Sequence, residues 1–311
     1  MSLPKAGIYR SLLTELPNPR TRGIDLKPTL DVVRRINRED GQVAKAVGRQ
    51  ARNIAKAADA IASALKAGGK LVFVGAGTSG RLGVLEAAEC PPTFGTPPGL
   101  VQAVMAGGRS SVFHSTEGAE DNMMDGARRT LKLVKKGDVV VGIAASGVTP
   151  FVRGALKAAR WRKCLTILVT SSGLLPGTEA DIVISPRVGP EVISGSTRLK
   201  SGTAAKLILN LLTTTAMIRL GKVYDHWMVD LKLTSRKLRL RGLRIISDLG
   251  RVGTPMAQRL MELSEGKVKV AVLAARLGEG TPKERVLRAR RLLLLADGSL
   301  RLALDRIGPG R

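Results

Sequence analysis

Short apolar runs alternate with helical stretches between residues 70 and 184, and this alternation constrains the fold more than any other feature of the chain. The runs are KLVFVGAG, LVQAVMAGG, DVVVGIAAS, CLTILVTSS and ADIVIS, each about the length of one strand. Amphipathic segments such as GRLGVLEAAE, AEDNMMDGARRTLKLV and TPFVRGALKAAR separate them. Because the runs are apolar throughout, we predict an α/β fold, a parallel sheet with helices on both faces in a three-layer sandwich.

Helical periodicity also flanks the sheet region on both sides. Apolar residues recur at helical spacing from TLDVVRRINRED to AIASALKAG, and again in STRLKSGTAAKLILNLLTTTAMIRLG, which ends at Gly221. From about residue 225 onward the pattern predicts helices throughout. We therefore expect an N-terminal lead-in and helix over 1–50, the sheet domain over 51–224 and a small helical domain over 225–311.

The net charge of the chain is +26, from 51 Lys and Arg against 25 Asp and Glu. Such a charge favours a nucleic-acid partner or a small anionic substrate, and a general compositional bias would also produce it. The basic residues are dispersed and only 3% of residues are aromatic, so stacking platforms for bases are scarce and a nucleic-acid partner is not expected.

The sequence gives little sign of a signal peptide, a membrane helix or a disulfide framework. The start, MSLPKAGIYR, lacks the apolar stretch of a signal peptide, and no apolar run approaches the length of a membrane helix. The two cysteines, Cys90 and Cys164, do not form a disulfide framework or a metal-type pair. We therefore expect a cytoplasmic protein with no membrane association and no bound metal.

A glycine-rich loop, GAGTSG, joins the first strand to the next helix. Its G-x-G-x-x-G spelling suits a phosphate at a helix N-terminus, but a dinucleotide site also needs an acid after the second strand, and VMAGGRSS has none. The third strand ends in a similar loop, AASGVTP, at the same edge of the sheet. A sugar phosphate is therefore favoured over a dinucleotide, with helix capping as the alternative role of Thr78 and Ser79. The predicted ligands are Gly77, Thr78, Ser79, Ser146, Gly147 and Thr149.

Two groups of acids lie near these loops. Glu86 and Glu89 are three residues apart on the helix after the first loop and are expected to share a face. The proline pair in ECPPT is expected to end that helix, and a carboxylate at a helix C-terminus is disfavoured in its charged form, which suits a general acid. EGAEDN places Glu117 and Glu120 at the start of the next helix, near the same crevice. Solvated or capping glutamates are the alternative interpretation of both groups.

Longer motifs extend these observations over nearly the whole chain. FVGAGTSGRLGVLEAAECPPTFG, EGAEDN, DVVVGIAASGVTPFV, GPEVISGSTRLKSGTAAKLILNLLTTTAMIRLGKVY and MVDLKLTSRKL resemble the N-acetylmuramic acid 6-phosphate etherase family. That family has a sugar isomerase (SIS) domain and is related to the glucokinase regulatory protein. The resemblance implies a SIS sugar-phosphate-binding domain over 51–224, release of D-lactate from the sugar phosphate by elimination and water addition, no cofactor, and a homodimer with pockets near its interface.

The resemblance also implies roles for individual residues. The family's catalytic glutamates match Glu89 in ECPPT and Glu120 in AED. Glu89 is expected to protonate the departing lactate and Glu120 to remove the C2 proton, and the reverse assignment stays open. Ser196 and Lys200 of SGSTRLKSG are expected to complete the pocket.

Several positions depart from the family's usual pattern. Val148 and Phe151 stand where the family has arginine and tyrosine, and the runs TSSGLLPG, YDHWMVD and LTSRKL are also altered. These changes affect how the sugar or lactyl group is held more than the type of reaction. Two other functions are compatible with the same loops: a sugar-phosphate-binding regulator without turnover, and an aldose–ketose isomerase.

Overall fold

The computed structural model describes residues 12–173 and 179–308, so the N-terminal MSLPKAGIYR segment lies outside the described residues. These residues divide into two compact units. The first comprises the described residues up to Ala88 together with Gly99–Thr215, and the second comprises Glu89–Pro98 together with the described residues from Ala216 onward. The division into 1–50, 51–224 and 225–311 stays a prediction.

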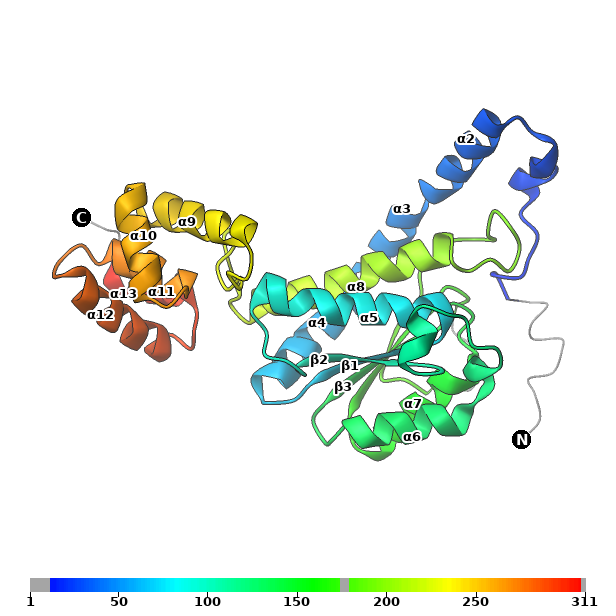
Figure 1. Cartoon of the computed structure of the whole chain (residues 1–311). Coiled ribbons are helices and arrows are strands. Elements are labelled where there is room, and N and C mark those ends of the chain that lie inside the picture. Colours follow the sequence, from blue (N-terminus) through cyan, green and yellow to red (C-terminus); the bar gives the residue numbers. More distant parts are fainter. Residues whose placement is uncertain (1–11, 174–178, 309–311) are drawn as a thin grey trace. The chain divides into compact units, whose positions relative to one another are not determined.

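A five-stranded parallel sheet forms the centre of the first unit, with strand order β2-β1-β3-β4-β5 (Figure 1). Leu71 of β1 lies opposite Val101 of β2 and Val139 of β3, so the strands start in register. Every residue of β1 and β3 is buried, as the apolar runs predict, and the predicted parallel sheet is confirmed. The strands are β1 Leu71–Gly75, β2 Val101–Met105, β3 Val139–Ile143, β4 Leu165–Val169 and β5 Ile182–Ile184.

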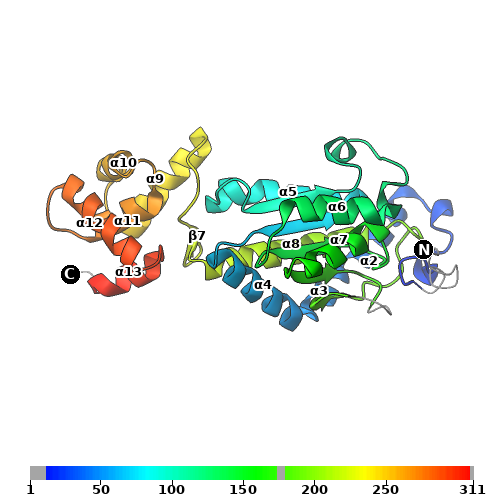
Figure 2. The same cartoon turned by 90° about the horizontal axis from the view of Figure 1, so that it is seen from below.

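Helices α6 (Met123–Leu133) and α7 (Pro150–Trp161) cover one face of the sheet, as the view from below shows (Figure 2). Phe151 and Val152 of α7 pack with Val72 and Val140 in one buried cluster. Gly126 of α6 lets the two helices approach closely, because a Cβ there would lie 2.0 Å from a backbone oxygen of α7.

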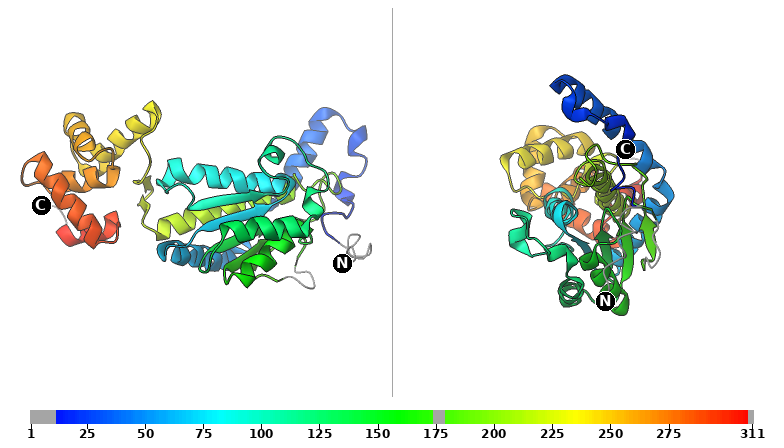
Figure 3. Two further views of the ribbon diagram at one scale, coloured as in Figure 1. Left: turned by 60° about the horizontal axis from the view of Figure 1, so that its bottom comes forward. Right: turned by 90° about the vertical axis from the view of Figure 1, so that its right-hand side faces the viewer.

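Helices α4 (Ala51–Lys66), α5 (Gly77–Phe94) and α8 (Lys200–Arg219) lie on the other face, so the sheet separates two helical layers (Figure 3). Gly83 of α5 sits directly on β1, since a Cβ there would lie 2.9 Å from the Cβ of Phe73. The predicted three-layer sandwich is therefore confirmed.

The N-terminal segment is fixed to the first unit by a buried carboxylate. It contains η1 Pro19–Thr21, η2 Ile24–Leu26, α2 Thr29–Asp40 and α3 Val43–Gly48. Glu39 of α2 accepts hydrogen bonds from Arg20 and Asn18, and from the Nζ of Lys200, 2.8 Å away. The Arg20 guanidinium, helped by Lys200 and Asn18, lowers the pKa of Glu39 to about 2.

The sequence analysis was wrong about three local features. The helix expected to end before the proline pair continues through Pro91 and Pro92 to Phe94, because Cys90 and Phe94 are buried one turn apart and Gly95 donates to the carbonyl of Pro91. The AED segment forms a separate short helix, η4 (Ala119–Asp121), before α6 begins. The region from residue 225 is not helical at first: β6 (Val223–Tyr224) and β7 (Trp227–Met228) form a small antiparallel hairpin.

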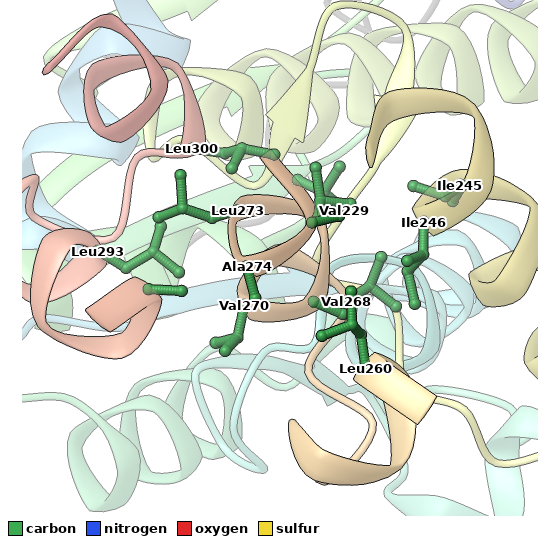
Figure 4. Close-up of a cluster of buried hydrophobic side chains, with 14 of the residues drawn as sticks. Val229, Ile245, Ile246, Leu260, Val268, Val270, Leu273, Ala274, Leu293 and Leu300 are labelled. Atoms are coloured by element: carbon green, nitrogen blue, oxygen red, sulfur yellow. The ribbon is translucent and has the colours of Figure 1, made fainter. Parts of the chain in front are cut away.

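The second unit contains a helical core built around α11, most of whose residues are buried (Figure 4). Ile245 and Ile246 of α9, Leu260 of α10 and Leu293 of α12 point toward it. The helices are α9 Arg236–Gly250, α10 Thr254–Leu263, α11 Val268–Arg276, α12 Pro282–Leu295 and α13 Leu300–Ile307.

We predict that Glu39→Gln destabilises the fold by about 3 kcal/mol, because Lys200 then stays fully buried without its carboxylate. Urea unfolding measures this loss. The double variant Glu39→Gln/Lys200→Met should recover most of it, and a double variant as unstable as the single one would contradict the explanation.

The same carboxylate predicts a pH dependence of stability. Its folded pKa of about 2 lies below the ordinary value of 4.5, so its stabilisation is complete above about pH 4.5 and is lost as the pH falls toward about 2. The slope of unfolding free energy against pH over this interval should be smaller in Glu39→Gln than in the unaltered chain.

Candidate functional site

Two cavities lie at the carboxyl edge of the sheet and share a boundary at Ala76, Gly77 and Glu120. The first, which we call the hydroxyl cavity, has a volume of about 260 Å³ and is lined by Thr78, Ser79, Ser146 and Thr149 among others. The second, which we call the arginine cavity, has a volume of about 310 Å³ and is lined by Arg81, Ser111, Ser115, Thr116 and Glu117 among others. The structure thus brings both predicted loops together, with Glu120 between the two cavities.

The first loop is shaped by its glycines. Gly77 has a φ of +52°, in the region that favours glycine, and starts α5. A Cβ on Gly75 would lie 2.6 Å from the backbone nitrogen of Gly80, so the turn from strand to helix is too tight for a side chain there. The tight turn places Thr78 and Ser79 at the positive end of α5, facing the hydroxyl cavity.

The second loop uses a similar arrangement after β3. Gly147 has a φ of +75° and its N–H donates to the carbonyl of Ala144, which reverses the chain. The Oγ of Ser146 accepts a hydrogen bond from the N–H of Val148, so its own O–H is still available as a donor. Thr149 is the N-cap of α7 but makes no side-chain capping bond, so its hydroxyl is not used by the helix.

The described lining of the hydroxyl cavity contains no Lys or Arg, and its ionisable residues are Glu15, Glu120 and Asp121. A phosphate there would rely on neutral hydroxyls, backbone N–H groups and the N-terminal ends of α5 and α7.

A cation that the sequence analysis missed lines the neighbouring arginine cavity. Arg81 donates to the backbone carbonyls of Val112 and Ser111, at 2.8 and 3.0 Å, which hold its guanidinium against that wall. Its place one turn after Gly77, in GAGTSGR, was the signal that could have found it.

Two predicted pocket residues lie elsewhere. The side chain of Lys200 is fully buried and bonded to Glu39, and its backbone N–H, with that of Ser201, is capped by the buried carboxylate of Glu191. Ser196 is half-buried and does not line either cavity, whereas its neighbours Gly195 and Thr197 line the hydroxyl cavity. The SGSTRLKSG stretch therefore reaches the hydroxyl cavity through Gly195 and Thr197, and not through the side chains of Ser196 and Lys200.

Glu89 is not among the described residues that line either cavity. Glu89 lies eleven residues beyond Thr78 on the continuous helix α5, which corresponds to about 16 Å along the axis. Its side chain is exposed, whereas Glu86 is 5% exposed and accepts hydrogen bonds from Lys206 and Thr213 of α8. Three residues turn the helix by about 300°, so the two side chains lie about 60° apart around the axis, with Glu86 in the buried contact with α8 and Glu89 at its exposed edge.

The positions that depart from the family pattern have different surroundings. Val148 lines the hydroxyl cavity, and Phe151 is fully buried in the core beneath α7. The TSSGLLPG run is described only as far as Gly173, and residues 174–178 lie outside the described residues. Among these changes, Val148 is the one that alters the described cavity wall.

Metal ligands, membrane-spanning helices and the two cysteines are considered next, within the described residues. Within them, no three His, Cys, Asp or Glu side chains gather as metal ligands would, and no helix is long and apolar enough to cross a membrane. Both cysteines are buried, and burial raises the pKa of the Cys164 thiol to about 11.

Comparison with known proteins assigns the family. A protein of Salmonella choleraesuis named N-acetylmuramic acid 6-phosphate etherase is 45% identical over 297 residues, covering 95% of this chain and 98% of that protein. The protein of the same name from Salmonella typhimurium is equally similar over the same coverage. The chain belongs to the N-acetylmuramic acid 6-phosphate etherase family. The model of the glucokinase regulatory protein N-terminal SIS domain matches residues 53–160. The family resemblance inferred from the sequence motifs is thus confirmed.

Solved structures similar to this etherase-family chain are more distant. A phosphoheptose isomerase from Francisella tularensis is 20% identical with a TM-score of 0.47, covering 61% of this chain and 98% of that one. A phosphoheptose isomerase from Neisseria gonorrhoeae is 20% identical with a TM-score of 0.43, covering 59% and 98%.

We predict that Thr149→Val weakens binding of inorganic phosphate by about fivefold, since one neutral hydrogen bond contributes about 1 kcal/mol. Isothermal titration calorimetry measures this. Ser63→Ala, which removes an exposed hydroxyl of α4, is the matched control and should bind phosphate normally. Unchanged binding by Thr149→Val would place the phosphate elsewhere.

Proposed function

We propose that this protein cleaves the D-lactyl ether of N-acetylmuramic acid 6-phosphate, giving N-acetylglucosamine 6-phosphate and D-lactate. The observation that carries the proposal is the 45% identity to proteins of that name over 95% of the chain. The two cavities give further support, because hydroxyl side chains line one of them and the carboxylate of Glu120 lies at their shared boundary.

The substrate has two anionic ends, and the cavities suggest how each is held. We place the 6-phosphate in the hydroxyl cavity, against Thr78, Ser79, Ser146 and Thr149, where hydroxyls and helix N-termini supply donors. The lactyl carboxylate then faces the arginine cavity, where Arg81 is the cation of the described lining. The sugar ring lies between them, beside Glu120.

The reaction proceeds by elimination and hydration. Ring opening exposes an aldehyde at C1, which acidifies the C2 proton, and Glu120 as base removes that proton. The C3–O bond breaks as a double bond forms between C2 and C3, and Glu89 protonates the departing lactate oxygen. Water then adds at C3, and the C2 proton is restored. One carboxyl must start charged and the other neutral, so the two need different surroundings.

Elimination followed by hydration involves no net change of oxidation state, so the reaction needs no redox cofactor. We further propose that the protein acts in the cytoplasm as a homodimer, with a sugar phosphate as its partner and no nucleic acid. A basic surface assists capture of this substrate, which carries a phosphate and a carboxylate, but the reaction does not require a net charge as large as +26. A regulator would need the hydroxyl loops but not Glu120 at the boundary of the two cavities, and an isomerase would release no lactate.

We predict D-lactate release from N-acetylmuramic acid 6-phosphate by the unaltered chain. Glu89→Gln and Glu120→Gln should each lower kcat by about 100-fold or more, as loss of an acid or base does. A coupled D-lactate dehydrogenase assay measures both. Phosphosugar binding without lactate release by the unaltered chain would favour the regulator.

Arg81 provides a second test of substrate placement. Arg81→Met should raise KM for the muramic acid substrate by about tenfold, because a charge-assisted hydrogen bond contributes about 1.5–3 kcal/mol. Affinity for N-acetylglucosamine 6-phosphate, which lacks the carboxylate, should change little. An equal loss for both ligands would show that Arg81 acts on the fold of the loop and not on the lactyl group.

A further inference from the structure

The second unit contains a cavity of about 920 Å³, which we call the lysine cavity. Its described lining belongs entirely to this unit, and none of these residues lines the hydroxyl cavity or the arginine cavity. A volume of this size suits a small organic molecule and exceeds what a single phosphate ion fills. We propose that the lysine cavity binds a small organic phosphate, a ligand with an apolar body and one dianionic phosphate group, separately from the reaction proposed above.

Buried apolar side chains form part of the wall of the lysine cavity. Val229, Val268 and Leu293 of the helical core line it, and each is less than a tenth exposed (Figure 4). Leu231 and Leu233, from the segment between β7 and α9, also line it. Apolar walls take the apolar surface of a ligand out of water, so this cavity suits an anion with an apolar body better than a bare ion or a sugar phosphate.

Two lysines of this cavity share a single carboxylate oxygen. The Nζ of Lys269 lies 2.8 Å from Oδ2 of Asp230, and the Nζ of Lys222 lies 2.9 Å from the same oxygen. Lys269 also donates to the carbonyl of Gly298, and its side chain is only 10% exposed. Two ammonium groups and one carboxylate leave a net charge of +1 in a partly buried place, where an uncompensated charge is costly. An anion that enters the cavity compensates it.

The charges inside the cavity favour a dianion. Lys232 lines it as well, is half-buried and donates to the carbonyl of Thr96. The buried and half-buried ionisable groups of the described lining are thus three lysines against Asp230, a net charge of +2. Its exposed groups, two cations and two acids, cancel: Arg239, Lys267, Glu262 and Glu265. A phosphate monoester carries a charge of about −1.5 to −2 at neutral pH, which matches the inner charge.

The pKa of Lys269 reflects this shortage of negative charge. Burial lowers the pKa below its ordinary value and Lys222 lowers it further, whereas Asp230 acts in the opposite direction. The charged ammonium is therefore less stable in the chain alone than in water. A phosphate beside it favours the charged form, so binding of the anion and protonation of Lys269 support each other.

The first turn of α11 adds backbone donors to the same cavity. Residues 266–270 line it, and the N-cap residue, Lys267, makes no side-chain capping bond. The first N–H groups of a helix have no partner within the helix and lie at its positive end. These groups stand beside Lys269, so the two kinds of donor can bind the oxygens of one phosphate together.

Titration calorimetry of the full chain with phenyl phosphate tests the proposal, because this probe joins a phosphate group to an apolar ring. Lys269→Met should weaken its binding about tenfold, since a charge-assisted hydrogen bond is lost while Asp230 keeps Lys222 as a partner. Lys232→Met, at a more exposed lysine, should weaken it about fivefold and serves if circular dichroism shows that Lys269→Met does not fold.

Matched controls separate this cavity from general charge and from the hydroxyl cavity. Lys283→Met removes an exposed lysine of α12 that does not line the cavity, and it should bind phenyl phosphate normally. Thr149→Val should leave the binding that depends on Lys269 unchanged. Phenol, which lacks the phosphate, should bind Lys269→Met and the unaltered chain equally.

Three results would overturn the proposal. Unchanged binding of phenyl phosphate by both Lys269→Met and Lys232→Met would show that the lysine cavity does not hold the phosphate. An equal loss in Lys283→Met would reduce the effect to overall charge, and a loss confined to Thr149→Val would place the probe in the hydroxyl cavity. None of these results depends on lactate release, so they leave the proposed function to its own test.

Discussion

The parallel pairing of β1 with β3 is the constraint on which the site depends. Because both strands run in the same direction and in register, their loops leave the sheet at the same edge and at the same height. Gly75 and Ile143 pair at that edge, directly before the two hydroxyl-bearing loops. A shift of register by one residue would turn the side chains of the shifted strand toward the opposite helical layers and displace its loop along the edge.

Buried carboxylates fix the surroundings of these loops. Glu191 caps the start of α8 through two backbone N–H groups, and Glu39 ties Arg20, Asn18 and Lys200 together beneath the same segment. Both acids lie close to the stretch that lines the hydroxyl cavity through Gly195 and Thr197. In a chain with so few acids, these two are used for structure, and Glu120 stays unburied at the cavity.

The sequence predicts the sheet and the loops because their patterns are local. Five apolar runs predict the parallel sheet, and the two glycine-containing loops that follow the first and third runs predict which edge of it carries the hydroxyls, without any tertiary information. Lys200 was misjudged because its partner, Glu39, is 161 residues away in the chain. The proline pair was misjudged because burial of Cys90 and Phe94 overrides a local preference. Arg81 was missed because only the folded segment η3 (Arg109–Val112) holds it against a cavity wall.

In a pocket lined by cations, the same side chains usually attract an anion and hold it. In the hydroxyl cavity these two tasks fall to different groups. Its described lining has no cation, whereas the whole chain carries a net charge of +26, so under the proposed function the long-range field guides the anionic substrate to the protein and neutral donors retain it. Salt screens the first step and leaves the second almost untouched. Ionic strength should therefore control how fast the substrate arrives far more than how long it stays.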